Sequence, residues 1–172
     1  RKAIEIKPDF TDAHYNLGNI LKDLGKLKEA ELSTRNAIKI KPNFAEAHSN
    51  LGRVLIDLGK FKEAELAICK AIELNPDYAK AYFDLSHLQY SNKNTKWKDQ
   101  LFSKRILNNK SQKDQVDIYF ARANILHKEK NYEESARYLK LANQLKIETR
   151  PSKPENIFNK SITLLTESDK KE

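Results

Sequence analysis

Apolar residues in the first half of the chain recur with the spacing of amphipathic helices. From position 13 to 24 they follow the i, i+4, i+7, i+8, i+11 pattern of one helix face. Gly25 comes next, at the place where glycine commonly ends a helix. A second apolar pattern runs from Leu27 to Ile38, and Pro42 cannot continue it. Residues 11–44 are therefore predicted to form two consecutive helices.

The same two-helix pattern returns after 34 residues, and residues 45–78 align with residues 11–44 without a gap. The matched pairs are His14 with His48, Leu17 with Leu51, Gly18 with Gly52, Leu21 with Leu55, Gly25 with Gly59, Ala30 with Ala64, Ala37 with Ala71 and Pro42 with Pro76. Ala3 and Pro8 fall in the Ala37 and Pro42 columns one period earlier. We expect residues 1–10 to be the end of a truncated repeat, in a chain that starts with Arg1 and lacks methionine.

The series His14-x-x-Leu17-Gly18-x-x-Leu21, followed by Ala30, Thr34 and Pro42, resembles the tetratricopeptide repeat. His14 stands where that family usually has Trp, Leu21 where it has Tyr, and Thr34 where it has Phe. The resemblance implies an all-α fold, namely a right-handed superhelical solenoid of antiparallel helix pairs. Each pair would bury its apolar face against its neighbours, so stability is shared along the array.

The second half departs from this regular pattern. Residues 79–115 are predicted to be a divergent repeat with an insertion, residues 116–149 a second divergent repeat, and residues 150–172 a linker and terminal helix. This half resembles the N-terminal region of bacterial tetratricopeptide–sulfotransferase proteins. That resemblance implies a recruiting or regulatory arm of a larger enzyme, whose catalytic domain would lie downstream.

The net charge of +8 is concentrated in the second half of the chain. Residues 1–90 carry 14 basic and 13 acidic side chains, whereas residues 91–172 carry 18 and 11. Lysine outnumbers arginine 25 to 7, and arginine is the better residue for bidentate phosphate recognition. Nucleic-acid binding is therefore disfavoured, although binding of an anion by residues 91–113 stays open. No apolar run could span a membrane, and we expect a cytoplasmic protein.

No motif in the sequence indicates catalysis. The repeat accounts for all four glycines, which leaves none for a phosphate-binding loop. Cys69 is the only cysteine, and His14 and His48 fill packing columns rather than a metal site. Trp97 and Phe102 lie near basic residues and are predicted to anchor a divergent helix. We expect a non-catalytic chain without cofactor or metal.

In a solenoid of helix pairs the first helix of each pair lines the concave side. The positions predicted to bind a protein or an extended peptide there are Tyr15, Asn16, Asn19, Lys22, Ser49, Asn50, Arg53, Lys80, Phe83, Asp84 and His87. In the fourth repeat the same side holds Asp117, Phe120, Asn124, His127 and Lys128. The exposed ends of such a solenoid could also self-associate.

Two known modes of peptide binding bear on this surface. A side-chain amide can both donate to and accept from a peptide backbone, so Asn16 and Asn50 could act in series. They resemble the asparagine ladder of O-GlcNAc transferase repeats, which Asp84 interrupts. Asp84 would also repel a C-terminal carboxylate. It therefore argues against the carboxylate clamp of chaperone-binding tetratricopeptide domains, although Asn19, Asn50 and Lys80 fall on clamp positions.

Overall fold

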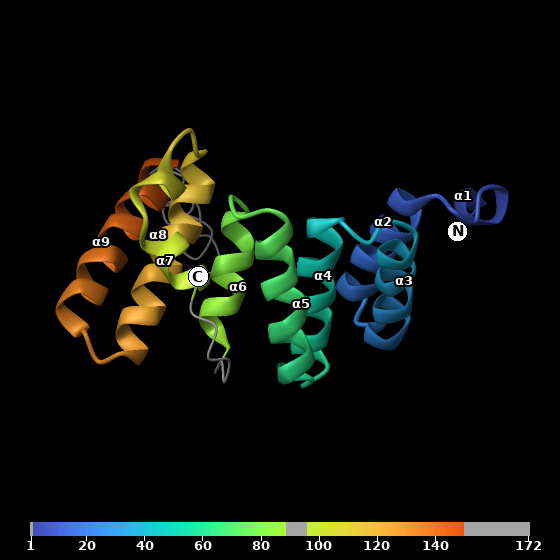
Figure 1. Cartoon of the computed structure of the whole chain (residues 1–172), viewed down its shortest axis with the longest axis horizontal. Helices are drawn as coiled ribbons and strands as arrows, with labels where there is room; N and C mark the ends of the chain where they lie inside the picture. The colour runs from blue at the N-terminus through green and yellow to red at the C-terminus, as the bar shows by residue number, and fades with distance from the viewer. Residues whose placement is uncertain (1, 89–95, 150–172) are drawn as a thin grey trace, which may run out of the picture.

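The computed structural model describes residues 2–88 and 96–149, and throughout these ranges the regular secondary structure is helical. In chain order the helices are α1 (Lys2–Ile6), α2 (Thr11–Asp23), α3 (Leu27–Ile40), α4 (Ala45–Asp57), α5 (Phe61–Leu74), α6 (Ala79–His87), α7 (Lys96–Phe102), the 3-10 helix η1 (Lys104–Leu107), α8 (Gln112–Lys128) and α9 (Tyr132–Thr149). They follow one another along the long axis of the molecule (Figure 1). The predicted linker and terminal helix lie outside the described residues.

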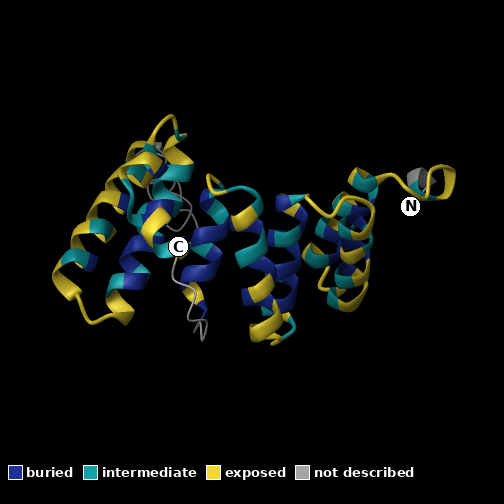
Figure 2. Cartoon of the chain, viewed as in Figure 1, coloured by how far each residue is buried: buried dark blue, intermediate teal, exposed yellow. Residues whose placement is uncertain are grey.

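The first two repeats fold as predicted, because α2 pairs with α3, α4 pairs with α5, and each pair packs on the next. Gly25 and Gly59 end α2 and α4 with φ angles of 72° and 74°, a conformation that costs glycine little. The expected all-α solenoid of helix pairs is thereby confirmed. The buried residues concentrate in the middle of the array, on α4, α5 and α6 (Figure 2).

The glycine column lets the two helices of a repeat approach closely. A side chain added at Gly52 would collide with Ile68 of α5, which is fully buried. At Gly18 it would collide with the Thr34 hydroxyl of α3. The small residues at these two positions therefore set the distance between paired helices.

The histidine column joins each repeat to the one before it. His14 Nε2 donates a hydrogen bond to the Pro8 carbonyl at 2.8 Å, and His48 Nε2 donates to the Pro42 carbonyl at 2.9 Å. In the third repeat Tyr82 takes the same place and donates to the Pro76 carbonyl at 2.8 Å. These side chains therefore have a structural role at each junction.

The second half has a different packing order. α6 is followed by the short helices α7 and η1, and α8 packs directly against α6 before pairing with α9. Trp97 and Leu101 of α7 are buried in the same core as Leu85 of α6 and Ile118 of α8. Trp97 thus anchors the divergent segment, as predicted.

Candidate functional site

The predicted binding residues lie on the first helices of successive repeats. Tyr15, Asn16, Asn19 and Lys22 belong to α2, Ser49, Asn50 and Arg53 to α4, and Lys80, Phe83, Asp84 and His87 to α6. Because the repeat is 34 residues long, equivalent positions recur at the same point of each of these helices.

Equivalent positions on these helices differ in burial. Asn16 is exposed, whereas Asn50 is only 3% exposed and Asp84 only 7%. The Asn50 amide nitrogen donates a 3.3 Å hydrogen bond to Thr34 Oγ1 of the preceding helix α3. Ser49 beside it is 1% exposed. Asn16 and Asn50 are thus not presented to solvent as two equivalent amides.

Asp84 forms the centre of a charged cluster between α4 and α6. Its Oδ1 lies 3.2 Å from Lys80 Nζ, and its Oδ2 lies 4.0 Å from Arg53 Nε. Burial raises the pKa of the Asp84 carboxyl group, and the charges of Lys80, Arg53 and His87 oppose that rise. Asp84 Oδ2 and Asn50 Oδ1 are both buried, and neither has a hydrogen-bond partner among the described residues. An unsatisfied buried acceptor costs about 1–3 kcal/mol.

Aromatic rings continue this cluster toward α8. The Phe83 ring lies 4.5 Å from the His87 ring and 6.3 Å from the Phe120 ring, centroid to centroid. Lys80 Nζ lies 4.1 Å from the Phe83 centroid, within range of a cation–π interaction. We call the set Asn50, Arg53, Lys80, Phe83, Asp84 and His87 the Asp84 surface. It combines buried acceptors, two long cationic side chains and an aromatic edge.

The predicted residues of α2 make different contacts. The Tyr15 ring packs on Phe44, with centroids 5.0 Å apart. Lys22 pairs with Asp23 at 2.9 Å, and its hydrogen bond and charge lower the pKa of the exposed Asp23 carboxyl group. Asn16 and Asn19 lie on this helix without burial comparable to that of Asn50. The α2 residues therefore form a more open continuation of the same side.

Sequence reasoning missed contacts that cross between helices. Lys146 of α9 lies 5.9 Å from the centroid of the Phe120 ring. The Asn124 amide of α8 donates to Ser86 Oγ at 3.1 Å and lies 3.3 Å from His87 Nε2. The prediction of binding positions gave no signal for Lys146, because it considered only the first helix of each pair.

The basic stretch 91–113 is partly engaged within the molecule. Lys98 Nζ lies 2.6 Å from a Glu129 carboxylate oxygen. Lys110 Nζ donates to the Asp77 carbonyl at 2.7 Å. These two lysines have a structural role, which weakens an anion-binding interpretation of that stretch. Lys93 lies outside the described residues.

The described residues include neither an activated cysteine nor a cluster of metal ligands. Burial, and secondarily the charge of Glu65, raise the pKa of the Cys69 thiol to about 11, so the nucleophilic thiolate is scarce at neutral pH. Within residues 2–88 and 96–149, no group of three or more His, Cys, Asp and Glu side chains could hold a metal ion.

The helices in the described part of the chain also lack the length and apolar character needed to cross a bilayer.

Solved structures share this fold at low sequence identity. The structure of MamA is 19% identical, with a TM-score of 0.59 and coverage of 88% of this chain and 86% of MamA. A structure from a functional characterisation of Pseudomonas aeruginosa pilF is 25% identical, with a TM-score of 0.64, covering 84% of this chain and 64% of that one. YrrB, described as a TPR protein with an unusual peptide-binding site, is 16% identical with a TM-score of 0.53 and coverage of 93% and 96%.

Sequence comparisons agree with the repeat alignment. A comparison with curated proteins gives no match. The predicted relation to sulfotransferase proteins receives no support from the matches and stays a prediction. One model of the tetratricopeptide repeat matches residues 11–44, and a second matches residues 45–78 and 116–146. These ranges together cover more than half of the sequence, and their helix pairs stack as the repeat requires, so the chain belongs to the tetratricopeptide repeat family.

Proposed function

We propose that this chain is a non-catalytic scaffold that binds a protein or an extended peptide across the Asp84 surface. The observation that carries the proposal is the pair of buried acceptors, Asn50 Oδ1 and Asp84 Oδ2, which find no hydrogen-bond partner in the part of the chain that the structure describes. Such groups are rare in folded proteins, where a protein group, a water or a bound partner usually satisfies them. Backbone amides or a cationic side chain of a partner would supply the missing donors.

The two cationic side chains beside these acceptors are partly exposed to solvent. The Arg53 side chain is 41% exposed and that of Lys80 is 33% exposed, and both have long flexible stems. Their rearrangement would open Asp84 and Asn50 to a partner without movement of the helices. Phe83 and His87 lie beside them and supply an apolar contact.

The remaining predicted residues extend the proposed site over α2. Tyr15, Asn16, Asn19 and Lys22 occupy the corresponding side of the preceding repeat. A peptide in extended conformation spans about 3.3 Å per residue, so a moderately long segment would reach both helices. Tetratricopeptide repeat proteins are generally interaction scaffolds, which supports this assignment.

Selection of peptides on the whole chain tests the proposal. Peptides would first be selected on the unchanged chain from a random library displayed on phage. Their affinity would then be measured for the unchanged chain and for the double variant Asn50→Ala/Arg53→Ala. We expect their affinity to fall at least about tenfold, which corresponds to 1.4 kcal/mol. The matched control is Arg137→Ala/Asn143→Ala on the exposed face of α9, which should bind like the unchanged protein. Unchanged affinity in the Asn50→Ala/Arg53→Ala variant would refute the assigned surface.

A further inference from the structure

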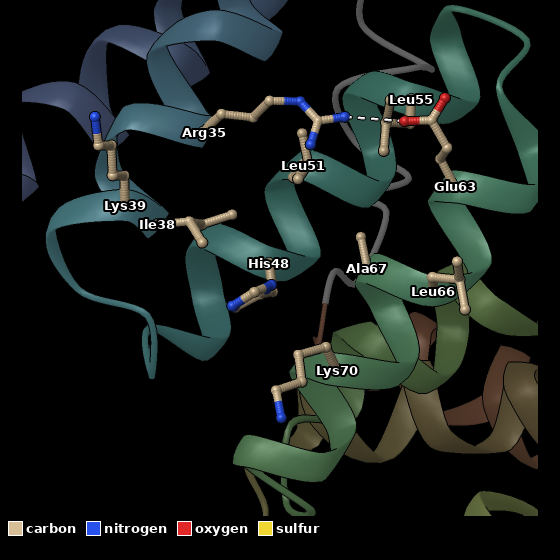
Figure 3. A pocket seen from close by; sticks show the side chains of 10 residues that line it. All are labelled: Arg35, Ile38, Lys39, His48, Leu51, Leu55, Glu63, Leu66, Ala67 and Lys70. Carbon is tan, nitrogen blue, oxygen red and sulfur yellow. Dashed lines mark hydrogen bonds and ion pairs between the residues drawn. The ribbon is translucent and has the colours of Figure 1, made fainter.

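The other side of the first two repeats carries an apolar groove that the proposed function does not use. This groove lies between α3 and α5, has α4 as its base and encloses about 480 Å³ (Figure 3). Ile38, Leu51, Leu55 and Ala67 supply its apolar lining. We call it the α3–α5 groove. A concave apolar surface of this kind is suited to side chains of a partner.

Helix α4 separates this groove from the Asp84 surface. His48, Leu51 and Leu55 of α4 line the groove. Ser49, Asn50 and Arg53 belong to the proposed peptide site. At about 100° per residue the two sets lie on opposite sides of the helix. A partner in the groove would therefore leave the Asp84 surface accessible.

The same groove occurs one repeat earlier with different charges. Its lining includes Leu17 and Leu21, the equivalents of Leu51 and Leu55, and it encloses about 340 Å³. Where the α3–α5 groove has Lys39 and Lys70, the earlier groove has Glu5 and Asn36. The apolar base is thus repeated, whereas the two lysines at its edge are replaced by one carboxylate and one neutral amide.

An ion-pair network fixes one end of the α3–α5 groove. Arg35 lies 2.8 Å from Glu31 and 3.0 Å from Glu63, and Lys60 lies 2.9 Å from Glu31. The dashed contact in Figure 3 is the Arg35–Glu63 pair across this end. Because the network links α3 with α5, the groove is formed before a partner binds, which reduces the entropy lost on binding.

Two lysines, Lys39 and Lys70, lie at the other end of the groove. Among the described residues they have fewer carboxylate partners than Arg35 has. Lys39 is exposed and forms no ion pair with a carboxylate in the described ranges. Lys70 has Glu73 at 2.8 Å, but that carboxylate is itself 70% exposed. A partner with carboxylates next to its apolar side chains would complement this end of the groove.

We propose that the α3–α5 groove binds an acidic amphipathic segment of a partner protein, with aliphatic side chains in the groove and carboxylates beside Lys39 and Lys70. Leu66 extends the apolar contact at the edge, where it is 65% exposed. The chain then holds two partners at once, one on each side of α4.

A labelled model peptide tests this site directly. The probe is a fluorescein-labelled synthetic peptide of leucine, alanine and glutamate, with leucines at i, i+4 and i+7 on one helix face. Its twin has lysine in place of every glutamate. In fluorescence anisotropy with the whole chain, we expect saturable binding of the acidic peptide and at least tenfold weaker binding of the basic twin, about 1.4 kcal/mol.

Matched variants locate the peptide on the molecule. Leu66→Asn should weaken binding about tenfold. Its control is Leu32→Asn, because Leu32 holds the equivalent position of the earlier groove and is 63% exposed. Lys39→Glu/Lys70→Glu should also weaken the acidic peptide about tenfold and favour the basic twin.

The proposal is overturned by equal affinity for the two peptides, by absence of saturable binding, or by equal losses from Leu32→Asn and Leu66→Asn. Asn50→Ala/Arg53→Ala should retain the affinity for the acidic peptide. A loss in that variant would place the peptide on the Asp84 surface and would also contradict the proposal.

Discussion

The regular repeats at residues 11–78 and the divergent half at residues 79–149 join their helices in different ways. In the regular repeats the same small and apolar residues recur at each interface, such as Gly52 against Ile68. In the divergent half, charged side chains donate hydrogen bonds to backbone carbonyls of another helix or segment. The first region is joined by packing contacts that repeat along the sequence, whereas the second adds individual polar contacts to a buried apolar core.

Arg122 is the clearest of these polar contacts. It is 5% exposed, and it donates from Nε to the Leu101 carbonyl at 2.8 Å and from Nη2 to the Ser103 carbonyl at 2.9 Å. Its guanidinium also lies 5.4 Å from the centroid of the Tyr138 ring. One side chain therefore connects the α7–η1 segment, α8 and α9.

Lys128 acts similarly at the end of α6. Its ammonium donates to the Ser86 carbonyl at 2.6 Å and to the Leu88 carbonyl at 2.5 Å. Carbonyls at a helix C-terminus lack helical partners, and a cation there is favourable. Burial lowers the pKa of Lys128. This contact helps explain how α8 can pack directly on α6.

The largest expected effect is a loss of stability when a polar contact of the divergent half is removed. Arg122→Met would leave two carbonyls without donors, and each loss costs about 1–3 kcal/mol, so the free energy of unfolding should fall by about 3 kcal/mol. Arg137→Met is the control, because Arg137 is 73% exposed and its ion pair with Glu134 lies at the surface. Urea unfolding measures both variants, and equal losses would contradict the assigned role of Arg122.

An intermediate effect tests the packing of the regular repeats. Gly52→Ala should lower the free energy of unfolding by about 1–3 kcal/mol, because its new methyl group collides with Ile68. In an Ile68→Ala background the same change should cost much less, since the Ile68 side chain is then removed, the Ala64 carbonyl at 3.3 Å is a milder contact, and alanine favours the helix. A Gly52→Ala effect that does not depend on residue 68 would show that the close approach is not the cause.

The smallest expected effect is a pH dependence of stability caused by Asp84, which lies at the boundary of the two regions. Its pKa is raised above 3.8 by burial, so the folded protein still holds this proton when the unfolded chain has released it. Asp84 therefore makes stability fall as pH rises from 3.8 through the folded-state pKa. Asp84→Asn should remove that fall, which makes its Tm relative to the unchanged protein higher at pH 7 than at pH 4. A constant Tm difference would contradict the raised pKa.

The regular region could be predicted from sequence because its packing repeats. The repeat pattern of residues 11–78 predicted the helix pairs and the structural role of the histidines. The burial of Asn50 could not be predicted, because it depends on Thr34 of the preceding repeat. The roles of Arg122 and Lys128 were also missed, since each depends on carbonyls far along the chain. Alignment of repeats detects recurrent contacts and gives no signal for those that occur once.

The proposed binding surface is tested most directly by NMR mapping of a phage-selected peptide on the whole isotopically labelled chain. The account predicts the largest amide shift changes on α4 and α6, around Asn50, Arg53, Phe83 and Asp84, with little change on α3 and α5. Changes confined to α3 and α5, or to the ends of the solenoid, would contradict it.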